Sequence, residues 1–313
     1  MKSSFQILIM VFCIFALMRC SGERPPYAHS EALPTAVIFA ENVVSSELPE
    51  FATSFSPDGN TVYFNLASAN RGTLKIMKSD FYDGEWQTPE ALPFADGTYR
   101  DLDPFVTADG KRLYFSSNRP LEGTEPNSNF DTWYVEKTAD GWGEPINPGS
   151  PLNSDAFEFF VSAANNGAVY FSSDARGENT NDIYRAALSG GEFLPPERIV
   201  LKMNGVELSP GNPLIAPDES FLIFVITTDA GLGGPDLYIS FQQDGNWSNA
   251  QNLGRSVNSE YADFAPCLSP DGAYLFFTSE RPGVVPEGVV DGRPPGDIWQ
   301  VDFDPQKYNL NNR

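Results

Sequence analysis

The hydrophobic pattern of the chain repeats five times. Each repeat has a short strand, a tight polar turn and a second strand dense in Tyr and Phe; these turn-plus-strand segments cover residues 57–64, 108–115, 165–171, 217–224 and 270–277. An Asp-Gly or Asn-Gly pair between two apolar runs predicts a hairpin, because such turns need positive φ. The fourth repeat is degenerate, with Glu219 in place of the glycine. A period of about fifty residues indicates a fold built from stacked units.

A third strand is predicted in each unit, and a fourth in the first four units. The third strand opens at Lys75, Asp131, Asp182, Asp236 or Asp297, and the fourth opens at Trp86, Trp142, Phe193 or Trp247. All five tryptophans fall at repeat positions, where we expect them to pack between neighbouring sheets. Each unit therefore predicts a four-stranded antiparallel sheet, which is the blade of a β-propeller.

The last unit lacks its fourth strand, and the N-terminal part of the chain supplies a candidate. Residues 42–47 (NVVSSE) align with residues 255–260 (RSVNSE), which lead from blade four into blade five. We therefore expect the N-terminal strand to complete the last blade and leave no open gap in the ring. The predicted fold is all-β, a five-bladed β-propeller of four-stranded antiparallel blades over residues 34–303.

The repeat motif resembles a known family. It reads Ser/Ala-Pro-Asp-Gly, then Tyr-Phe-Ser-Ser-Asn-Arg, then Asp-Ile-Tyr, and is similar to the WD40-like repeat of TolB-type propellers of the bacterial envelope. The resemblance covers roughly residues 34–303. It implies a propeller fold but no particular activity, because the family is functionally diverse.

The N-terminus predicts export. Lys2 precedes an apolar run from Phe5 to Met18, which is too short to favour a spanning helix and is typical of a signal peptide. The run ends in Leu-Met-Arg-Cys and resembles a bacterial lipoprotein box, which implies cleavage before Cys20 and a lipid anchor on its sulfur. Cleavage near Gly22, releasing a soluble periplasmic protein, is the alternative. We thus divide the chain into a lipoprotein-type signal peptide (1–19), a linker (20–33), the propeller (34–303) and a tail (304–313), and expect a cell-envelope location.

Charge and composition exclude several kinds of chemistry. The net charge of -22 disfavours nucleic-acid binding, because such a surface repels phosphates. The one histidine, His29, lies outside the predicted ring, so neither a Ser-His-Asp triad nor a His-ligated metal site can form there. We expect a monomer without cofactors. Calcium is a weak alternative, since residues 125–131 and 178–182 offer oxygen ligands without matching a defined calcium loop.

Acidic and basic residues recur at matched positions. Glu50, Asp101, Glu158 and Asp263 lie where the first strands begin, and Arg71, Arg119, Arg176 and Arg281 lie between the second and third strands. Blade four lacks both members, with Pro210 and Gly231 instead. A structural ring of ion pairs explains this joint loss, because one charge buried without its partner is costly. Alternatively, two of the acids at the channel mouth act on a glycan as acid and base or acid and nucleophile.

These observations favour one function and leave another open. The acids obey the repeat, whereas catalytic residues usually break it because each has a different task. We therefore expect a non-catalytic, envelope-anchored propeller that binds a protein or glycan partner through its loop face. The alternative is a carboxylate-dependent glycan-active enzyme. Two long loops, residues 118–131 and 280–297, are candidate binding loops.

Overall fold

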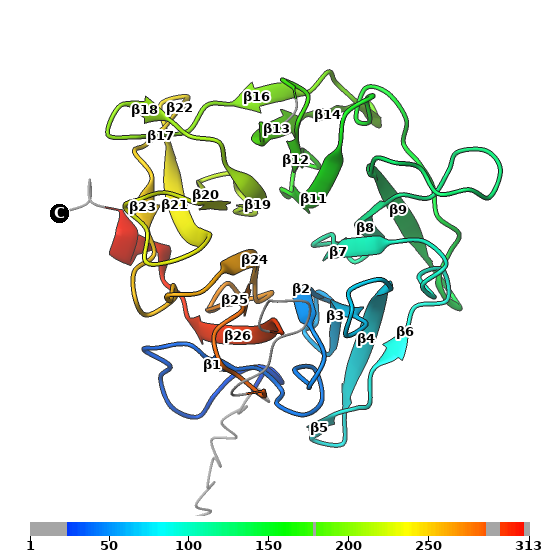
Figure 1. Ribbon diagram of the computed structural model, residues 1–313, viewed down its shortest axis with the longest axis horizontal. Helices are drawn as coiled ribbons and strands as arrows, with labels where there is room; N and C mark the ends of the chain where they lie inside the picture. Colours follow the sequence, from blue (N-terminus) through cyan, green and yellow to red (C-terminus); the bar gives the residue numbers. More distant parts are fainter. Residues whose placement is uncertain (1–23, 178–179, 286–294, 310–313) are drawn as a thin grey trace, which may run out of the picture.

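The computed structural model describes residues 24–177, 180–285 and 295–309. Five antiparallel sheets, one for each sequence repeat, stand around a common axis (Figure 1). The described chain is almost entirely β-strand and loop, apart from one short 3₁₀ helix, η1 (Pro305–Tyr308). The predicted five-bladed β-propeller is confirmed.

Each blade runs outward from the axis in chain order. The innermost strands are β2 (Glu50–Phe55), β7 (Asp101–Val106), β11 (Glu158–Ala163), β19 (Gly211–Ile215) and β24 (Asp263–Leu268). The second strands are β3 (Thr61–Ala67), β8 (Arg112–Ser117), β12 (Val169–Ser173), β20 (Phe221–Ile226) and β25 (Tyr274–Ser279). The third strands are β4 (Leu74–Tyr82), β9 (Asp131–Thr138), β13 (Asp182–Ala186), β21 (Asp236–Gln243) and β26 (Asp297–Asp302).

The outermost strand is broken into short pieces. It consists of β5 (Glu85–Trp86) and β6 (Glu90–Ala91) in blade one, β10 (Gly141–Trp142) in blade two, and β22 (Asn246–Trp247) and β23 (Gln251–Asn252) in blade four. Blade three has the hairpin β14 (Leu188–Ser189) and β15 (Glu192–Phe193) and then β16 (Glu197–Ile199), while β17 (Lys202–Met203) and β18 (Val206–Glu207) form a hairpin before blade four. In three blades, Pro89, Pro145 or Pro195 interrupts the strand, because proline cannot donate to the hydrogen-bond ladder.

The N-terminal segment closes the ring as predicted. Strand β1 (Val37–Ile38) pairs antiparallel with β26, with Val37 opposite Gln300 and Ile38 opposite Trp299. Phe39 and Val44 are buried in a cluster that also contains residues of blades one and five. Tyr27, which we placed in the linker, is buried against Phe55 as well. The hydrophobic core thus includes a residue of the predicted linker.

A β-bulge in every innermost strand links neighbouring blades. The bulge residues share positive φ and equivalent positions: Ala52, Asp103, Phe160, Asn212 and Ala265. Four of them donate their backbone N–H to a side chain on the second strand of the preceding blade: Thr278 (3.1 Å), Asn65 (2.7 Å), Ser116 (3.1 Å) and Ser172 (3.0 Å). In blade four, Val225 has no acceptor, and the Oδ1 of Asn212 accepts from Ala265 at 3.4 Å instead.

The same bulges fill the channel. Ala52, Phe160 and Ala265 form a buried apolar cluster, with Phe51, Phe159 and Phe264 packed against it. These residues belong to blades one, three and five, so the cluster crosses the axis. Apolar side chains from three blades therefore meet near the axis of the ring.

The degenerate turn of blade four is held by its neighbour. Glu219 has a φ of 61°, a conformation that L-residues adopt at a cost. Its carboxylate accepts hydrogen bonds from Arg185 Nε at 2.7 Å, Tyr170 Oη at 2.8 Å and Asn166 Nδ2 at 2.6 Å, all on blade three. These contacts offset the backbone strain and join two blades, which explains why a glutamate can replace glycine here.

Candidate functional site

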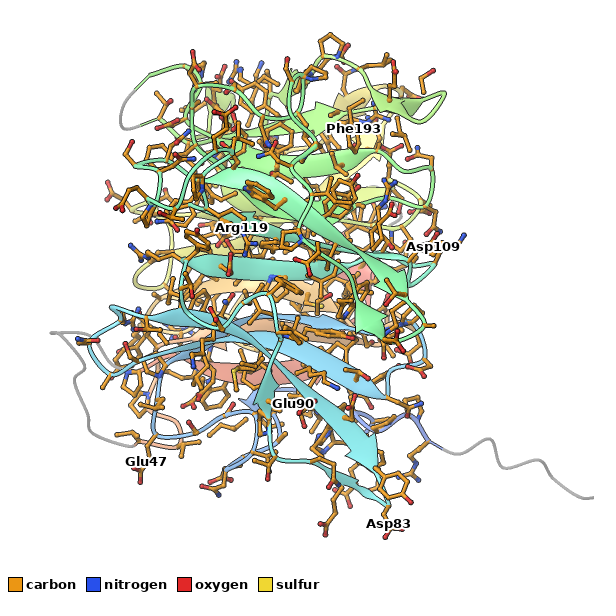
Figure 2. All side chains as sticks on the ribbon, turned by 90° about the vertical axis from the view of Figure 1, so that its right-hand side faces the viewer. Glu47, Asp83, Glu90, Asp109, Arg119 and Phe193 are labelled. Carbon is orange, nitrogen blue, oxygen red and sulfur yellow. The ribbon has the colours of Figure 1, made fainter. Side chains whose placement is uncertain are left out.

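The two faces of the ring carry different residues. Figure 2 shows the propeller edge-on, with Arg119 toward one face and Asp109, in a hairpin turn, at the other. We call the first the loop face, because the innermost strands begin there. We call the second the turn face, because it carries the hairpin turns between first and second strands.

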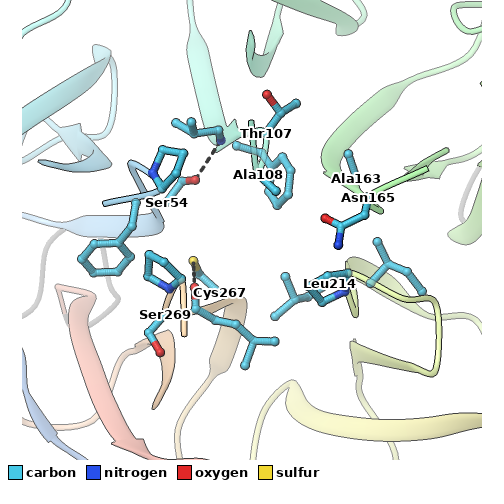
Figure 3. A pocket seen from close by; sticks show the side chains of 16 residues that line it. Ser54, Thr107, Ala108, Ala163, Asn165, Leu214, Cys267 and Ser269 are labelled. Carbon is cyan, nitrogen blue, oxygen red and sulfur yellow. Dashed lines mark hydrogen bonds between the residues drawn. The ribbon is translucent and has the colours of Figure 1, made fainter. Parts of the chain in front are cut away.

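The turn face holds a small pocket on the axis (Figure 3). It has a volume of about 160 Å³ and is lined by all five blades, with Pro57, Ala108, Asn165, Pro217 and Pro270 at equivalent positions. Cys267 also lines it, and burial raises the pKa of this thiol to about 12. No acidic side chain is among the lining residues. This pocket therefore offers no acid or base for catalysis.

Two of the predicted ion pairs are present within single blades. Asp101 Oδ1 lies 2.7 Å from Arg119 Nη2, and Asp263 Oδ1 lies 2.6 Å from Arg281 Nη2. Both carboxylates are buried. Burial raises the pKa of Asp101 even though Arg119 opposes that shift. A neighbouring guanidinium thus neutralises each of these two aspartates.

The other two acids have different partners. Glu50 accepts hydrogen bonds from the N–H and Oγ of Ser46, and Glu158 accepts the same pair from Ser154. Ser259 binds Asp263 in the same way, so these serine contacts do not decide which acid an arginine binds. The arginines of blades one and three nevertheless bind other acids. Arg71 lies 3.4 Å from Glu280, and Arg176 lies 2.5 Å from Asp182. Burial raises the pKa of Glu50 to about 8 and that of Glu158 to about 7.

The loop face has a pocket of about 360 Å³, which we call the aromatic pocket. It is lined by Phe51, Phe130, Phe157, Phe159, Leu74, Leu102, Ala67, Arg71 and Arg100. The four phenylalanines are only half-buried, and the rings of Phe130 and Phe157 lie 6.4 Å apart. The Arg100 guanidinium lies over the Phe130 ring at 5.7 Å. Apolar ring faces are therefore open to a ligand next to a cationic group.

The aromatic pocket and the repeat acids come from the same strands. Phe51, Leu102 and Phe159 each directly follow one of the acids Glu50, Asp101 and Glu158 in sequence. The innermost strands of blades one, two and three thus carry both the pocket wall and the buried carboxyls. None of the four acids itself lines the pocket.

Asp103 is a candidate that our sequence analysis missed. It occupies the bulge position of blade two, where the other blades have Ala52, Phe160, Asn212 and Ala265. Burial raises the pKa of its carboxyl to about 7, and among the described residues its carboxyl oxygens have no hydrogen-bond partner. The sequence feature that could have identified Asp103 is its departure from the repeat, because Asp103 is the one acid among the five bulge residues.

The predicted calcium loops do not form a cation site in the part of the chain that the structure describes. Asp182 is held by Arg176 at 2.5 Å and Arg198 at 3.1 Å, and Asp131 accepts from Asn147 at 3.0 Å. Residues 178–179 of the second loop lie outside the described residues. Across residues 24–177, 180–285 and 295–309, no group of three or more His, Cys, Asp or Glu side chains is placed to hold a metal ion.

Comparisons with known proteins establish the fold class. No protein-family model matches the sequence, and neither does any curated protein. An α-L-arabinofuranosidase from Lactobacillus brevis aligns over 85% of this chain and 95% of its own, with 14% identity and a TM-score of 0.54. An exo-β-1,3-galactanase from Clostridium thermocellum aligns over 84% and 62%, with 13% identity and a TM-score of 0.51. At these identities the likeness shows the five-bladed propeller fold alone.

The TolB resemblance is supported only at the level of the fold. A TolB candidate from Agrobacterium tumefaciens aligns over 83% of this chain and 92% of its own, with 16% identity and a TM-score of 0.47. That score carries no argument for family membership. The comparisons thus show a five-bladed β-propeller fold and no particular family.

Our expectation of a non-catalytic binding propeller is corrected by these comparisons. Glycoside hydrolases of the same fold recur among the matched structures, so the fold is compatible with the glycan-active alternative. The physical reason for the error is that we judged only acids at repeated positions. Arginines neutralise Asp101 and Asp263 but neither Glu50 nor Glu158, and the aromatic pocket and Asp103 depend on residues that differ between blades.

Proposed function

We propose that the protein is a carboxylate-dependent glycan-active enzyme whose sugar-binding site is the aromatic pocket. The observation that carries the proposal is the group of four half-buried phenylalanines on the face where the buried acids lie. Aromatic faces pack against the apolar C–H faces of sugar rings, and a few polar groups fix the orientation of the ligand. The likeness in fold to glycoside hydrolases supports the same reading.

Asp103 and Glu158 are the carboxyls that we propose for the chemistry. Glycoside hydrolysis needs one protonated carboxyl as acid and a second carboxylate as base or nucleophile. Neither side chain is neutralised by an arginine, and burial raises both pKa values to about 7. Neither carboxyl itself lines the pocket; each is next in sequence to residues that do, since Phe157 and Phe159 flank Glu158 and Leu102 precedes Asp103. Because a group with a pKa near the working pH can give and take protons, both suit acid–base catalysis.

The test is hydrolysis of a glycan panel by the wild type, Asp103→Asn and Glu158→Gln. If these groups transfer protons, each substitution should lower kcat by about 100-fold or more. Glu50→Gln is the matched control, because Glu50 has the same serine contacts and a raised pKa but is not flanked by two pocket phenylalanines. Loss of activity in Glu158→Gln together with retention in Glu50→Gln supports the proposal. Full activity of both catalytic variants contradicts it.

We also propose that the protein is an exported, TolB-type envelope lipoprotein, a monomer held to the membrane through Cys20. Supporting this are the apolar run before Cys20 and the repeat motif. Residues 1–23 lie outside the described residues. No helix in the described part of the chain has the length and apolar content needed to cross a bilayer. Mass spectrometry of the purified N-terminus should show a lipid-modified Cys20; an unmodified chain starting at Ser21 or beyond contradicts the anchor.

A further inference from the structure

We infer that the aromatic pocket takes a sugar ring that carries a carboxylate, a uronic acid residue of an acidic glycan, and that Arg100 binds this carboxylate. The inference rests on the proposed function and names its substrate class. It is drawn from the charge, exposure and stacking of one side chain beside the phenylalanines.

Arg100 is set apart from most arginines of the propeller. Seven others lie within 4 Å of a carboxylate oxygen: Arg71, Arg112, Arg119, Arg176, Arg185, Arg198 and Arg281. Within residues 24–177, 180–285 and 295–309, no acid lies at that distance from Arg100. Its side chain is exposed and lies over Phe130, and its backbone N–H is held by Asn118 Oδ1 at 2.9 Å. The guanidinium is therefore oriented, solvated and available to an anion.

The position of Arg100 departs from the repeat. The equivalent residues in the other blades, directly before the first-strand acid or Pro210, are Pro49, Phe157, Ser209 and Ala262. A cation that served the ring structure would recur, as the arginines paired with Asp101 and Asp263 do. In a chain with 42 acidic and 20 basic residues, a free guanidinium at a pocket is a local exception to a field that repels anions.

The neighbours of Arg100 specify more than an anion. A small anion alone would make no use of four phenylalanine faces, and a neutral sugar would make no use of the free guanidinium. A guanidinium matches a carboxylate in geometry and can bind it through two parallel N–H bonds. The volume of about 360 Å³ lies within the range of roughly 300–1,000 Å³ for small-molecule sites. A pyranose ring with a carboxylate uses both features.

Binding of four monosaccharides to the full chain tests the inference directly. D-galacturonate and D-glucuronate are compared with D-galactose and D-glucose by ligand-observed NMR titration at pH 7. We expect the uronates to bind at least tenfold more tightly than their neutral counterparts, since a charge-assisted bond contributes that much or more. Arg100→Gln should abolish this preference.

Arg255→Gln is the matched control. Arg255 is also exposed and has no carboxylate within ion-pair distance among the described residues, but it does not line the aromatic pocket. The preference for uronates should survive this substitution. Equal binding of charged and neutral sugars by the wild type overturns the inference, and so does a preference that Arg100→Gln retains.

Hydrolysis assays separate this inference from the proposed function. Aryl uronides and the matching neutral aryl glycosides are supplied to the same three proteins. Hydrolysis of neutral glycosides without any preference for uronides leaves the proposed function intact and overturns the choice of substrate. Arg100-dependent binding of uronates without hydrolysis of any glycan supports the binding site and contradicts the proposed enzyme.

Discussion

The buried ion pair of blade two allows the most direct test of how strongly a desolvated charge pair stabilises a blade. Asp101 Oδ1 accepts from Arg119 Nη2 at 2.7 Å and from Ser117 Oγ at 2.6 Å. The Arg119 side chain is 10% exposed and that of Asp101 is 1% exposed. The guanidinium also lies over the Phe115 ring at 5.1 Å and the Trp133 ring at 5.5 Å. Neither charge can reach water if its partner is removed.

Removal of one partner should therefore be costly. Arg119→Met or Asp101→Asn should each lower the free energy of unfolding by about 3 kcal/mol, because the remaining group stays buried without its counter-charge. The double variant should lose less than the sum, with a coupling energy of about 1.5 kcal/mol or more. Arg119→Met should be less destabilised at acid pH. Burial already raises the pKa of Asp101, so without Arg119 it regains stability as the carboxyl takes up a proton.

The same blade supplies the control. Arg112 and Glu136 lie on β8 and β9 at 3.2 Å, but their side chains are 36% and 53% exposed. Solvent screens such a pair, and its coupling energy should stay below about 1 kcal/mol. Urea unfolding of both double-mutant cycles, followed by tryptophan fluorescence, gives the two values. Equal coupling in the buried and the exposed pair would refute the argument that desolvation makes the first one strong.

Three further outcomes follow from the fold. Deletion of residues 34–45 removes β1 and the buried Phe39 and should lower the melting temperature markedly; an unchanged melting temperature contradicts ring closure by this strand. Glu219→Ala should destabilise the protein more than an ordinary surface change, because the positive φ at this position then lacks its offsetting contacts. A melting temperature within error of the wild-type value contradicts a stabilising role for these contacts. The pKa of Glu50 rises from 4.5 to about 8 on folding, so stability should fall as pH rises between these values, and less steeply in Glu50→Gln; identical pH–stability curves of the two proteins would argue against the shift.

The local pattern of the sequence was enough to predict the five blades and the strand that closes the ring. Tight turns, aromatic strands and a period of about fifty residues specify a sheet that cannot bury both faces alone, so the units must stack. The alignment of residues 42–47 with residues 255–260 identified the strand that completes blade five, and β1 pairs there with β26. These inferences succeeded because each depends on neighbours in sequence or on repetition.

Partner choice among the charged residues required the tertiary structure. Four acids and four arginines share repeat positions, yet only Asp101 and Asp263 pair with the arginine of their own blade. A serine four residues earlier binds Glu50, Glu158 and also Asp263, yet of these three acids only Asp263 binds an arginine as well. Several carboxylates lie at similar sequence separations from each arginine. Only the packing of the folded chain decides which of them the arginine binds.

The candidate site could not be predicted from the sequence for a related reason. The aromatic pocket gathers Phe51, Phe130 and Phe159 from three blades, and Arg100 joins them by stacking on Phe130. Asp103 becomes a buried, unpaired acid only because the bulge and the neighbouring blades surround it. The repeating residues of this chain determine the ring, whereas the aromatic pocket and Asp103 arise where single blades depart from the repeat and where folding brings those departures together.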